Sequence, residues 1–176
     1  MEKNQKNFPS SSPYKILEQL ASCNQGQITP SLLELLDYRE HYTLFLEISK
    51  LRPLTYEEEV LVKQYLVSSY MYFEQRLEEK MHSLLLHPHH AELKDQAYHT
   101  TTFMKNILGL LSHYSGNEFL FFTYPESIKK IDSKIQDLLL LDIHPVMVYE
   151  KYIASAVKQE AYETAGLYLK KLKELT

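Results

Sequence analysis

The sequence predicts an all-α fold, a single-domain bundle of six or seven helices that ends in a helical hairpin. Apolar residues recur at spacings of three and four along most of the chain, which is the period of an amphipathic helix. The 176 residues include 4 Gly and 7 Pro, too few for a turn-rich sandwich or barrel. A chain of this length can bury a sufficient core without metal or disulfide staples.

Charge and cysteine content exclude several classes of protein. A net charge of −4 with a pI of about 6.1 provides no basic surface for nucleic acid. The one cysteine, Cys23, rules out an internal disulfide framework and a Cys-rich zinc module. No apolar run reaches the roughly 18 residues of a membrane span, and the first residues lack the apolar stretch of a secretory signal. We therefore expect a cytoplasmic protein with no membrane or nucleic-acid partner.

The N-terminal part is expected to form a tail and two helices. Residues 1–13 are polar and end in a Ser/Pro-rich stretch, which is typical of a flexible tail. Residues 14–22 carry apolar side chains on one helical face. A second helix over 29–51 begins at a Thr-Pro pair, suited to the N-cap and first position, and ends before an Arg-Pro pair.

The central part is expected to form two long helices. Thr55 and Glu58 have the spacing of a capping box, which predicts a helix from there to about Leu86. Its apolar residues repeat at three and four, and a His-Pro pair stops it. A further helix over 91–113 has an apolar middle, and a Ser-Gly-Asn turn at 115–117 follows it.

The C-terminal part is expected to form three more helices. The aromatic segment 119–124 has the composition of a strand but nothing to pair with, so we expect a buried irregular segment or a short helix. A helix over 125–141 follows and is broken by His144-Pro145. Helices over 146–158 and 161–175 close the chain. The expected division is thus a bundle over 14–145 with a hairpin over 146–176 packed on it.

Small residues flank the short polar link of this hairpin, which allows its two helices to approach closely. Tyr162 is expected to fold over the preceding helix. Such a hairpin has too little apolar area to be stable alone and must pack on the bundle or on a partner. The residues expected to hold it are Ile153, Ala156, Val157, Tyr162, Ala165, Leu169 and Leu172.

Residues 153–175 resemble the UVR motif, a helical hairpin of the excision-repair proteins UvrB and UvrC, of ClpC and of McsA-type regulators. The chain departs from the motif at Ala161 and at Leu169-Lys170, where the motif has charged residues. The resemblance implies contact with another hairpin, in a second copy of the chain or in a different protein. The matching positions are Ile153, Ala156, Tyr162-Glu163, Ala165-Gly166, Leu172 and Leu175.

The sequence contains no complete catalytic motif, which favours a non-enzymatic adaptor or regulator that acts through a protein partner or as a homodimer. Its 14 tyrosines and absence of tryptophan fit this interpretation, because tyrosine offers a large apolar body with a polar tip at interfaces. No cofactor is expected. The candidate partner-binding residues are Tyr152, Tyr162, Glu163 and Tyr168.

Two alternatives remain open from the sequence. The first is a helical sensor that binds a small apolar ligand in a pocket lined by Met104, Phe119, Phe121, Phe122 and Tyr124. The second is a metal-dependent enzyme, because five of the eight histidines fall within residues 82–99. Its candidate ligands are His87, His89 and His90, although the His/Glu spacings of zincins and di-iron bundles are absent.

Overall fold

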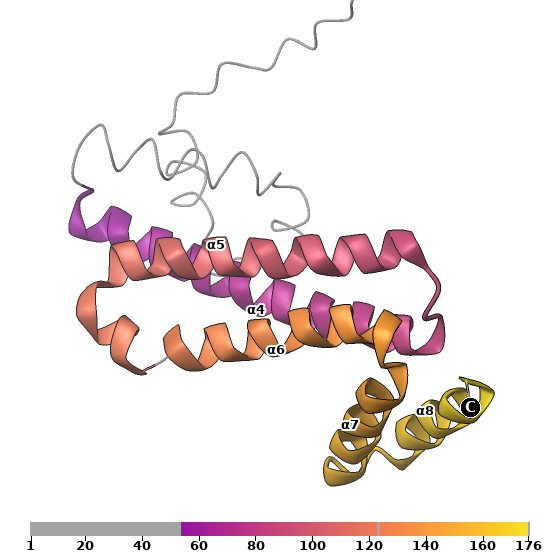
Figure 1. The fold of residues 1–176 in the computed structure, drawn as a ribbon. Helices are drawn as coiled ribbons and strands as arrows, with labels where there is room; N and C mark the ends of the chain where they lie inside the picture. Colours follow the sequence, from indigo (N-terminus) through magenta and orange to yellow (C-terminus); the bar gives the residue numbers. More distant parts are fainter. Residues whose placement is uncertain (1–53, 123, 176) are drawn as a thin grey trace, which may run out of the picture. The chain divides into compact units, whose positions relative to one another are not determined.

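The computed structural model describes residues 54–122 and 124–175, and it describes their side chains except over 114–122. The described residues form helices without a strand, as the sequence predicts for an all-α protein. The expected tail over 1–13, the helices expected over 14–22 and 29–51, and Cys23 lie outside the described residues. The helices are α4 (Tyr56–Leu86), α5 (Ala91–Phe122), α6 (Tyr124–Ile143), α7 (Pro145–Lys158) and α8 (Tyr162–Leu175) (Figure 1).

The capping box that the sequence predicts is present at the start of α4. The backbone N–H of Thr55 donates to the Glu58 carboxylate over 2.9 Å, and the N–H of Glu58 donates to the Thr55 hydroxyl over 3.3 Å. Three acidic residues in the first turn also lie at the positive end of the helix dipole. These contacts satisfy backbone donors that have no partner within the helix.

Helix α5 differs from its predicted bounds at the C-terminal end. It begins at an N-cap made by His90, whose Nδ1 accepts from the N–H of Leu93 over 3.2 Å. The predicted end at His113 and the predicted turn at 115–117 are wrong, because α5 continues to Phe122. The segment 119–124, expected to be irregular or a short helix of its own, instead continues α5 up to residue 122. A single glycine within a helix costs only about 1 kcal/mol, so the glycine at position 116 does not by itself end α5.

Helix α7 begins with Pro145 and ends in a Schellman motif. Proline suits the first position of a helix because its missing N–H has no partner there anyway. At the other end, the N–H of Ala161 donates to the carbonyl of Ala156 over 2.9 Å, and the N–H of Glu160 donates to that of Val157 over 3.0 Å. Glu160 has a φ of 60°, the left-handed conformation that glycine usually adopts here.

The chain divides into two compact units, residues 1–69 and 70–176, with the division inside α4. The described part of the first unit is the N-terminal portion of α4, where Val62, Tyr65 and Leu66 are buried. In the second unit α5 packs along α6, α7 packs along α8, and α6 also contacts α7 (Figure 1). The core of this unit includes Leu77, Met81, Leu84, Met104, Leu108, Ile131 and Leu138.

Candidate functional site

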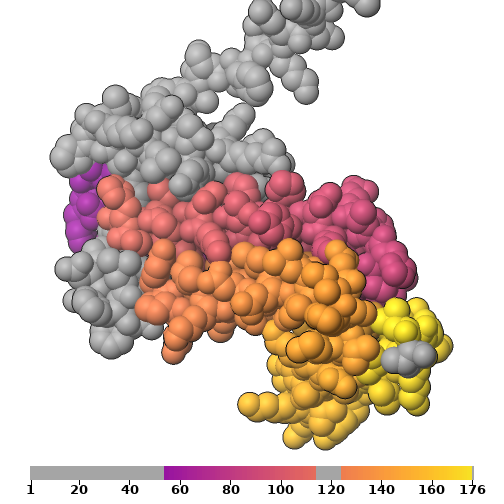
Figure 2. Space-filling model, viewed as in Figure 1, coloured from indigo at the N-terminus to yellow at the C-terminus, as the bar shows by residue number. Residues whose placement is uncertain are grey.

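Exposed apolar side chains concentrate in the C-terminal segment of the second unit. Nine of the 13 exposed large apolar residues in the described part of the chain lie between Leu139 and Leu175. Figure 2 shows the atoms of α7 and α8, in gold to yellow, open to view beside α6. Exposed apolar side chains that gather on one face mark contact surfaces more often than scattered single residues do. The nine are Leu139, Ile143, Val146, Met147, Val157, Tyr162, Leu167, Leu169 and Leu175.

The outer face of α8 consists of Tyr162, Gly166, Leu169 and Lys173, which the helical period places on one side. Tyr162 is 66% exposed and Leu169 is 43% exposed. A Cβ added to Gly166 would meet nothing within 4 Å, so no packing within the chain requires a glycine there. The face therefore combines exposed apolar area with a position at which another backbone can approach closely.

Behind this face, α8 is held to α4 by a tyrosine and a histidine. The Tyr168 hydroxyl and the His82 Nδ1 are hydrogen-bonded at 2.6 Å, and their rings lie 5.5 Å apart between centroids. Tyr168 is 4% exposed. Burial, helped by the negative charge of Glu78, raises the pKa of Tyr168 to about 12. The ring therefore stays protonated at neutral pH and acts as a structural contact.

A second polar network connects α4, α6 and α7. The Lys134 ammonium lies 2.8 Å from the Glu78 carboxylate and donates to the Tyr152 hydroxyl over 3.0 Å. Burial raises the pKa of Tyr152 above its usual value, and the negative charges of Asp137 and Glu78 raise it further. Tyr152 also contacts Tyr168 edge to face, with 6.3 Å between ring centroids. The two networks are thus connected through the contact between Tyr152 on α7 and Tyr168 on α8.

A polar groove of about 500 Å³ runs along these networks. The groove is lined by side chains of both networks and by residues of the link between α7 and α8. It therefore belongs to the region where α4, α6, α7 and α8 meet. The lining residues are Glu78, His82, Lys134, Tyr152, Ser155, Ala156, Gln159, Ala161, Thr164 and Tyr168.

Asp137 is a buried carboxylate that Lys151 neutralises. Asp137 is 4% exposed, and both its oxygens lie 2.7 Å from the Lys151 ammonium. The same ammonium donates to the Ser133 hydroxyl over 2.9 Å. A carboxylate at this depth requires such a partner, because an unpaired buried charge is strongly destabilising. The pair joins the middle of α6 to α7.

The four predicted partner-binding residues divide into two pairs. Tyr162 and Glu163 are exposed at the start of α8, whereas Tyr168 is buried and Tyr152 is half-buried. Tyr168 therefore offers almost no exposed surface in this structure, and Tyr152 offers only part of its side chain. Tyr162, which was expected to fold over the preceding helix, is 66% exposed, and Val157 and Leu169, which were expected to help hold the hairpin, are exposed as well.

Tyr149 and Tyr168, not Tyr162, are the buried aromatic residues of this segment. The Tyr149 hydroxyl donates to the Leu85 carbonyl in the last turn of α4. Sequence reasoning did not find Glu78, His82 or Lys134, because each acts through a partner on another helix. No local pattern specifies such a contact, since it depends on how the helices pack.

The histidine-rich stretch has a structural explanation at one position. His90 caps α5, as described above, while His87 and His89 are exposed in the turn between α4 and α5. Among the residues that the structure describes, no three His, Cys, Asp or Glu side chains come together in a way that could hold a metal ion. The alternative of a metal centre at His87, His89 and His90 thus receives no support.

The predicted apolar pocket is not assembled as expected by the side chains that are described. Met104 is buried and lines a groove between α4 and α6, and Tyr124 is not among the residues lining it. Phe119, Phe121 and Phe122 lie within α5, and their side chains are outside the described part of the structure.

Within 54–122 and 124–175, no helix combines the length and the apolar character of a membrane span. Comparisons of the chain with protein-family models, with curated proteins and with solved structures find no significant match. Neither the likeness to the UVR motif nor any other family relationship receives support from them.

Proposed function

We propose that the chain is a non-enzymatic adaptor or regulatory protein that binds a protein partner through the outer face of α8. The observation that carries the proposal is the exposure of Tyr162 and Leu169 beside Gly166, whose Cβ position faces open space. Covering such apolar area removes it from water, which is the main favourable contribution to most protein association. A tyrosine next to a small residue also provides a ring and a shallow recess for a partner's side chain.

In this proposal α7 and α8 act together as a helical hairpin that presents a rigid surface. Tyr168 holds α8 to α4 through His82, and Tyr149 holds α7 to α4 through the Leu85 carbonyl. A surface fixed in this way loses little conformational entropy on binding, which favours affinity. Tyr152 and Tyr168 thus support the surface from within, while Tyr162 and Glu163 contact the partner.

Charge on α8 favours an orientation for the partner. Glu163 lies in the first turn, and Lys173 lies in the last. No described side chain forms an ion pair with either residue. A partner helix with the same arrangement would pair acidic with basic ends when it runs antiparallel. This suits both a second copy of the chain and a different protein with a similar helix.

Photo-crosslinking from the outer face of α8 tests the proposal. A benzoylphenylalanine in place of Tyr162 in the full-length chain should form a crosslinked product in cells. The same residue in place of Tyr98 is the matched control, because Tyr98 is an exposed tyrosine on α5, at 48%. The additional change Leu169→Ser should lower the yield from position 162. Products from Tyr98 equal to those from Tyr162, or none from Tyr162, would contradict the proposal.

The mass of the product distinguishes the two kinds of partner. A product of twice the chain mass identifies a second copy, and sedimentation of the purified chain should then show dimers that Leu169→Ser dissociates. A product of another mass identifies a different protein.

A further inference from the structure

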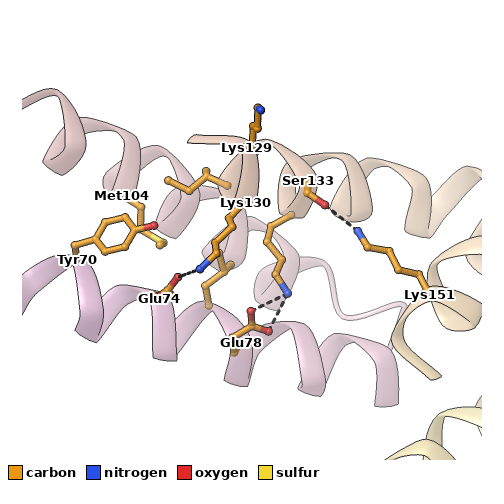
Figure 3. Close-up of a pocket in the computed structure, with 11 residues that line it drawn as sticks. Tyr70, Glu74, Glu78, Met104, Lys129, Lys130, Ser133 and Lys151 are labelled. Atoms are coloured by element: carbon orange, nitrogen blue, oxygen red, sulfur yellow. Dashed lines mark hydrogen bonds and ion pairs between the residues drawn. The ribbon is translucent and has the colours of Figure 1, made fainter. Parts of the chain in front are cut away.

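A groove of about 450 Å³ lies between α4 and α6 in the second unit, apart from the outer face of α8. Its floor is apolar, formed by Leu77, Met104 and Ile131, each no more than 2% exposed. Figure 3 shows residues from α4 and α6 facing each other along it. The volume falls within the range of small-molecule sites, and its apolar floor suits the body of such a ligand.

The rim of the groove carries an excess of positive charge. Four lysines and two glutamates line it, in a chain whose net charge is −4. Lys134 is held by Glu78 at 2.8 Å, and Lys151 is held by Asp137 at 2.7 Å. When Asp137, the partner of Lys151, is counted with the two glutamates, the four lysines exceed the three carboxylates by one. The groove therefore suits a ligand with a single negative charge better than a dianion such as a phosphate monoester.

Lys130 is the cation most available to such a ligand. Its ammonium lies 3.8 Å from the Glu74 carboxylate, the longest of the three ion pairs at the rim, and the side chain is 72% exposed. An exposed pair at this distance contributes little to stability, so another carboxylate can compete for the ammonium. In Figure 3 Lys130 points toward Glu74 across the groove, whereas its neighbour Lys129 points away.

The Tyr70 hydroxyl lies at the same end of the groove as Glu74. It is buried and makes no hydrogen bond of ordinary length and angle, although the Ser127 hydroxyl is close enough to act on it. Burial raises its pKa, the Ser127 hydroxyl opposes this shift, and the nearby charge of Glu74 adds to it. A buried hydroxyl without an acceptor is unfavourable, and a ligand carboxylate placed here would supply that acceptor.

We propose that this groove binds a small apolar monocarboxylate. Its hydrocarbon body covers Leu77, Met104 and Ile131, and its carboxylate replaces Glu74 at Lys130 and accepts from the Tyr70 hydroxyl. Glu74, on the exposed rim, turns toward solvent. The site is independent of the partner surface on α8, so either proposal can fail without the other.

Calorimetric titration of the full-length chain with octanoate tests the site, with octanol and octyltrimethylammonium as neutral and cationic probes of similar apolar length. Octanoate should bind saturably and the cation at least about tenfold more weakly, since one charge contact exchanged for a repulsion is worth about 1.4 kcal/mol. Equal binding of the three probes, or no saturable binding of octanoate, would overturn the proposal.

Variants at the rim make the test specific. Lys130→Gln should weaken octanoate binding at least about fivefold, and Glu74→Gln should tighten it because a competing carboxylate is lost. Lys129→Gln is the matched control and should change the affinity less than about twofold. Tyr70→Phe should weaken binding without lowering the free energy of unfolding, because it removes a hydroxyl that makes no hydrogen bond of ordinary geometry. An equal loss from Lys129→Gln and Lys130→Gln, or weaker binding by Glu74→Gln, would refute the placement.

Discussion

Tyr149 connects the end of α4 to α7 through one buried hydrogen bond. Its ring is fully buried, and its hydroxyl donates to the carbonyl of Leu85, one of the last carbonyls of α4. Carbonyls in the last turn of a helix have no partner within the helix, so the tyrosine satisfies an acceptor that burial would otherwise leave unpaired.

Replacing Tyr149 by phenylalanine should lower the free energy of unfolding by about 1–3 kcal/mol, because the ring remains while the Leu85 carbonyl loses its donor. Urea denaturation followed by circular dichroism measures the change. Tyr162→Phe is the control and should change stability by less than about 0.5 kcal/mol, since that side chain is 66% exposed. Equal effects of the two substitutions would mean that the Tyr149 hydroxyl contributes nothing.

Tyr168 should make stability fall at alkaline pH. Its pKa in the folded chain is about 12, above the ordinary 10.0, so the folded state holds this proton more tightly than the unfolded state does. Its contribution is complete below pH 10 and is lost as the pH rises toward 12. Tyr168→Phe should therefore make the decline between pH 10 and 12 shallower, by about 1–3 kcal/mol over the range. Denaturation series at several pH values, with Tyr162→Phe as control, measure this slope; parallel declines in all three proteins would contradict the assignment.

At the scale of helices, the sequence predicts a boundary well where a capping residue or a proline close to the helix end determines it. The Thr55–Glu58 capping box and the prolines at 88, 125 and 145 all mark positions where a helix begins or ends in the structure. The end of α5 was predicted wrongly because a Ser-Gly-Asn turn and a glycine inside a helix have the same local sequence. Intrinsic preferences of about 1 kcal/mol per residue do not decide between the two.

Gly166 offers a prediction for the stability of α8. Gly166→Ala should raise the free energy of unfolding by about 0.5–1 kcal/mol, because alanine favours the helix and its Cβ would meet no neighbour. Gly109→Ala on α5 is a matched control with the same open surroundings. If the outer face of α8 contacts a partner closely, Gly166→Ala should also reduce the crosslink from position 162, whereas Gly109→Ala should not.

The opposite results would be informative. Destabilisation by Gly166→Ala would show that the glycine has a role within the folded chain, and an unchanged crosslink would place the partner elsewhere on α8.

At the scale of the second unit, α7 and α8 are integral to the fold. Val148, Tyr149 and Tyr168 are all buried, and two of these form hydrogen bonds to α4. A chain that ends at His144 should therefore lose at least about 3 kcal/mol of stability, the effect of removing one large buried side chain. Urea denaturation measures the loss. The full-length chain with Tyr162→Ser and Leu169→Ser is the control, because it changes the same segment only at exposed positions; equal stability of the truncated and full-length chains would contradict the prediction.

The sequence identifies which residue types favour the candidate surface but not which of them face outward. Tyr162 and Tyr168 lie six positions apart on one helix, and both have the composition of an interface residue. Their exposures are 66% and 4%, and Tyr168 packs against His82 of α4, a contact that no pattern in α8 specifies. The groove over Met104 is equally hidden from sequence, because its lysines and glutamates look like ordinary solvated faces until two helices bring them together.

The left-handed backbone at Glu160 makes this position a candidate for a stabilising substitution. An L-residue in this conformation is disfavoured by about 1 kcal/mol relative to glycine, so Glu160→Gly is a stabilising change available by a single substitution. A library screened for thermal resistance alone should recover glycine at this position. If a partner contacts the Glu160 carboxylate, a library screened for growth of the host should lose glycine at this position. A difference between the two screens would then reveal a role in recognition that stability measurements cannot detect.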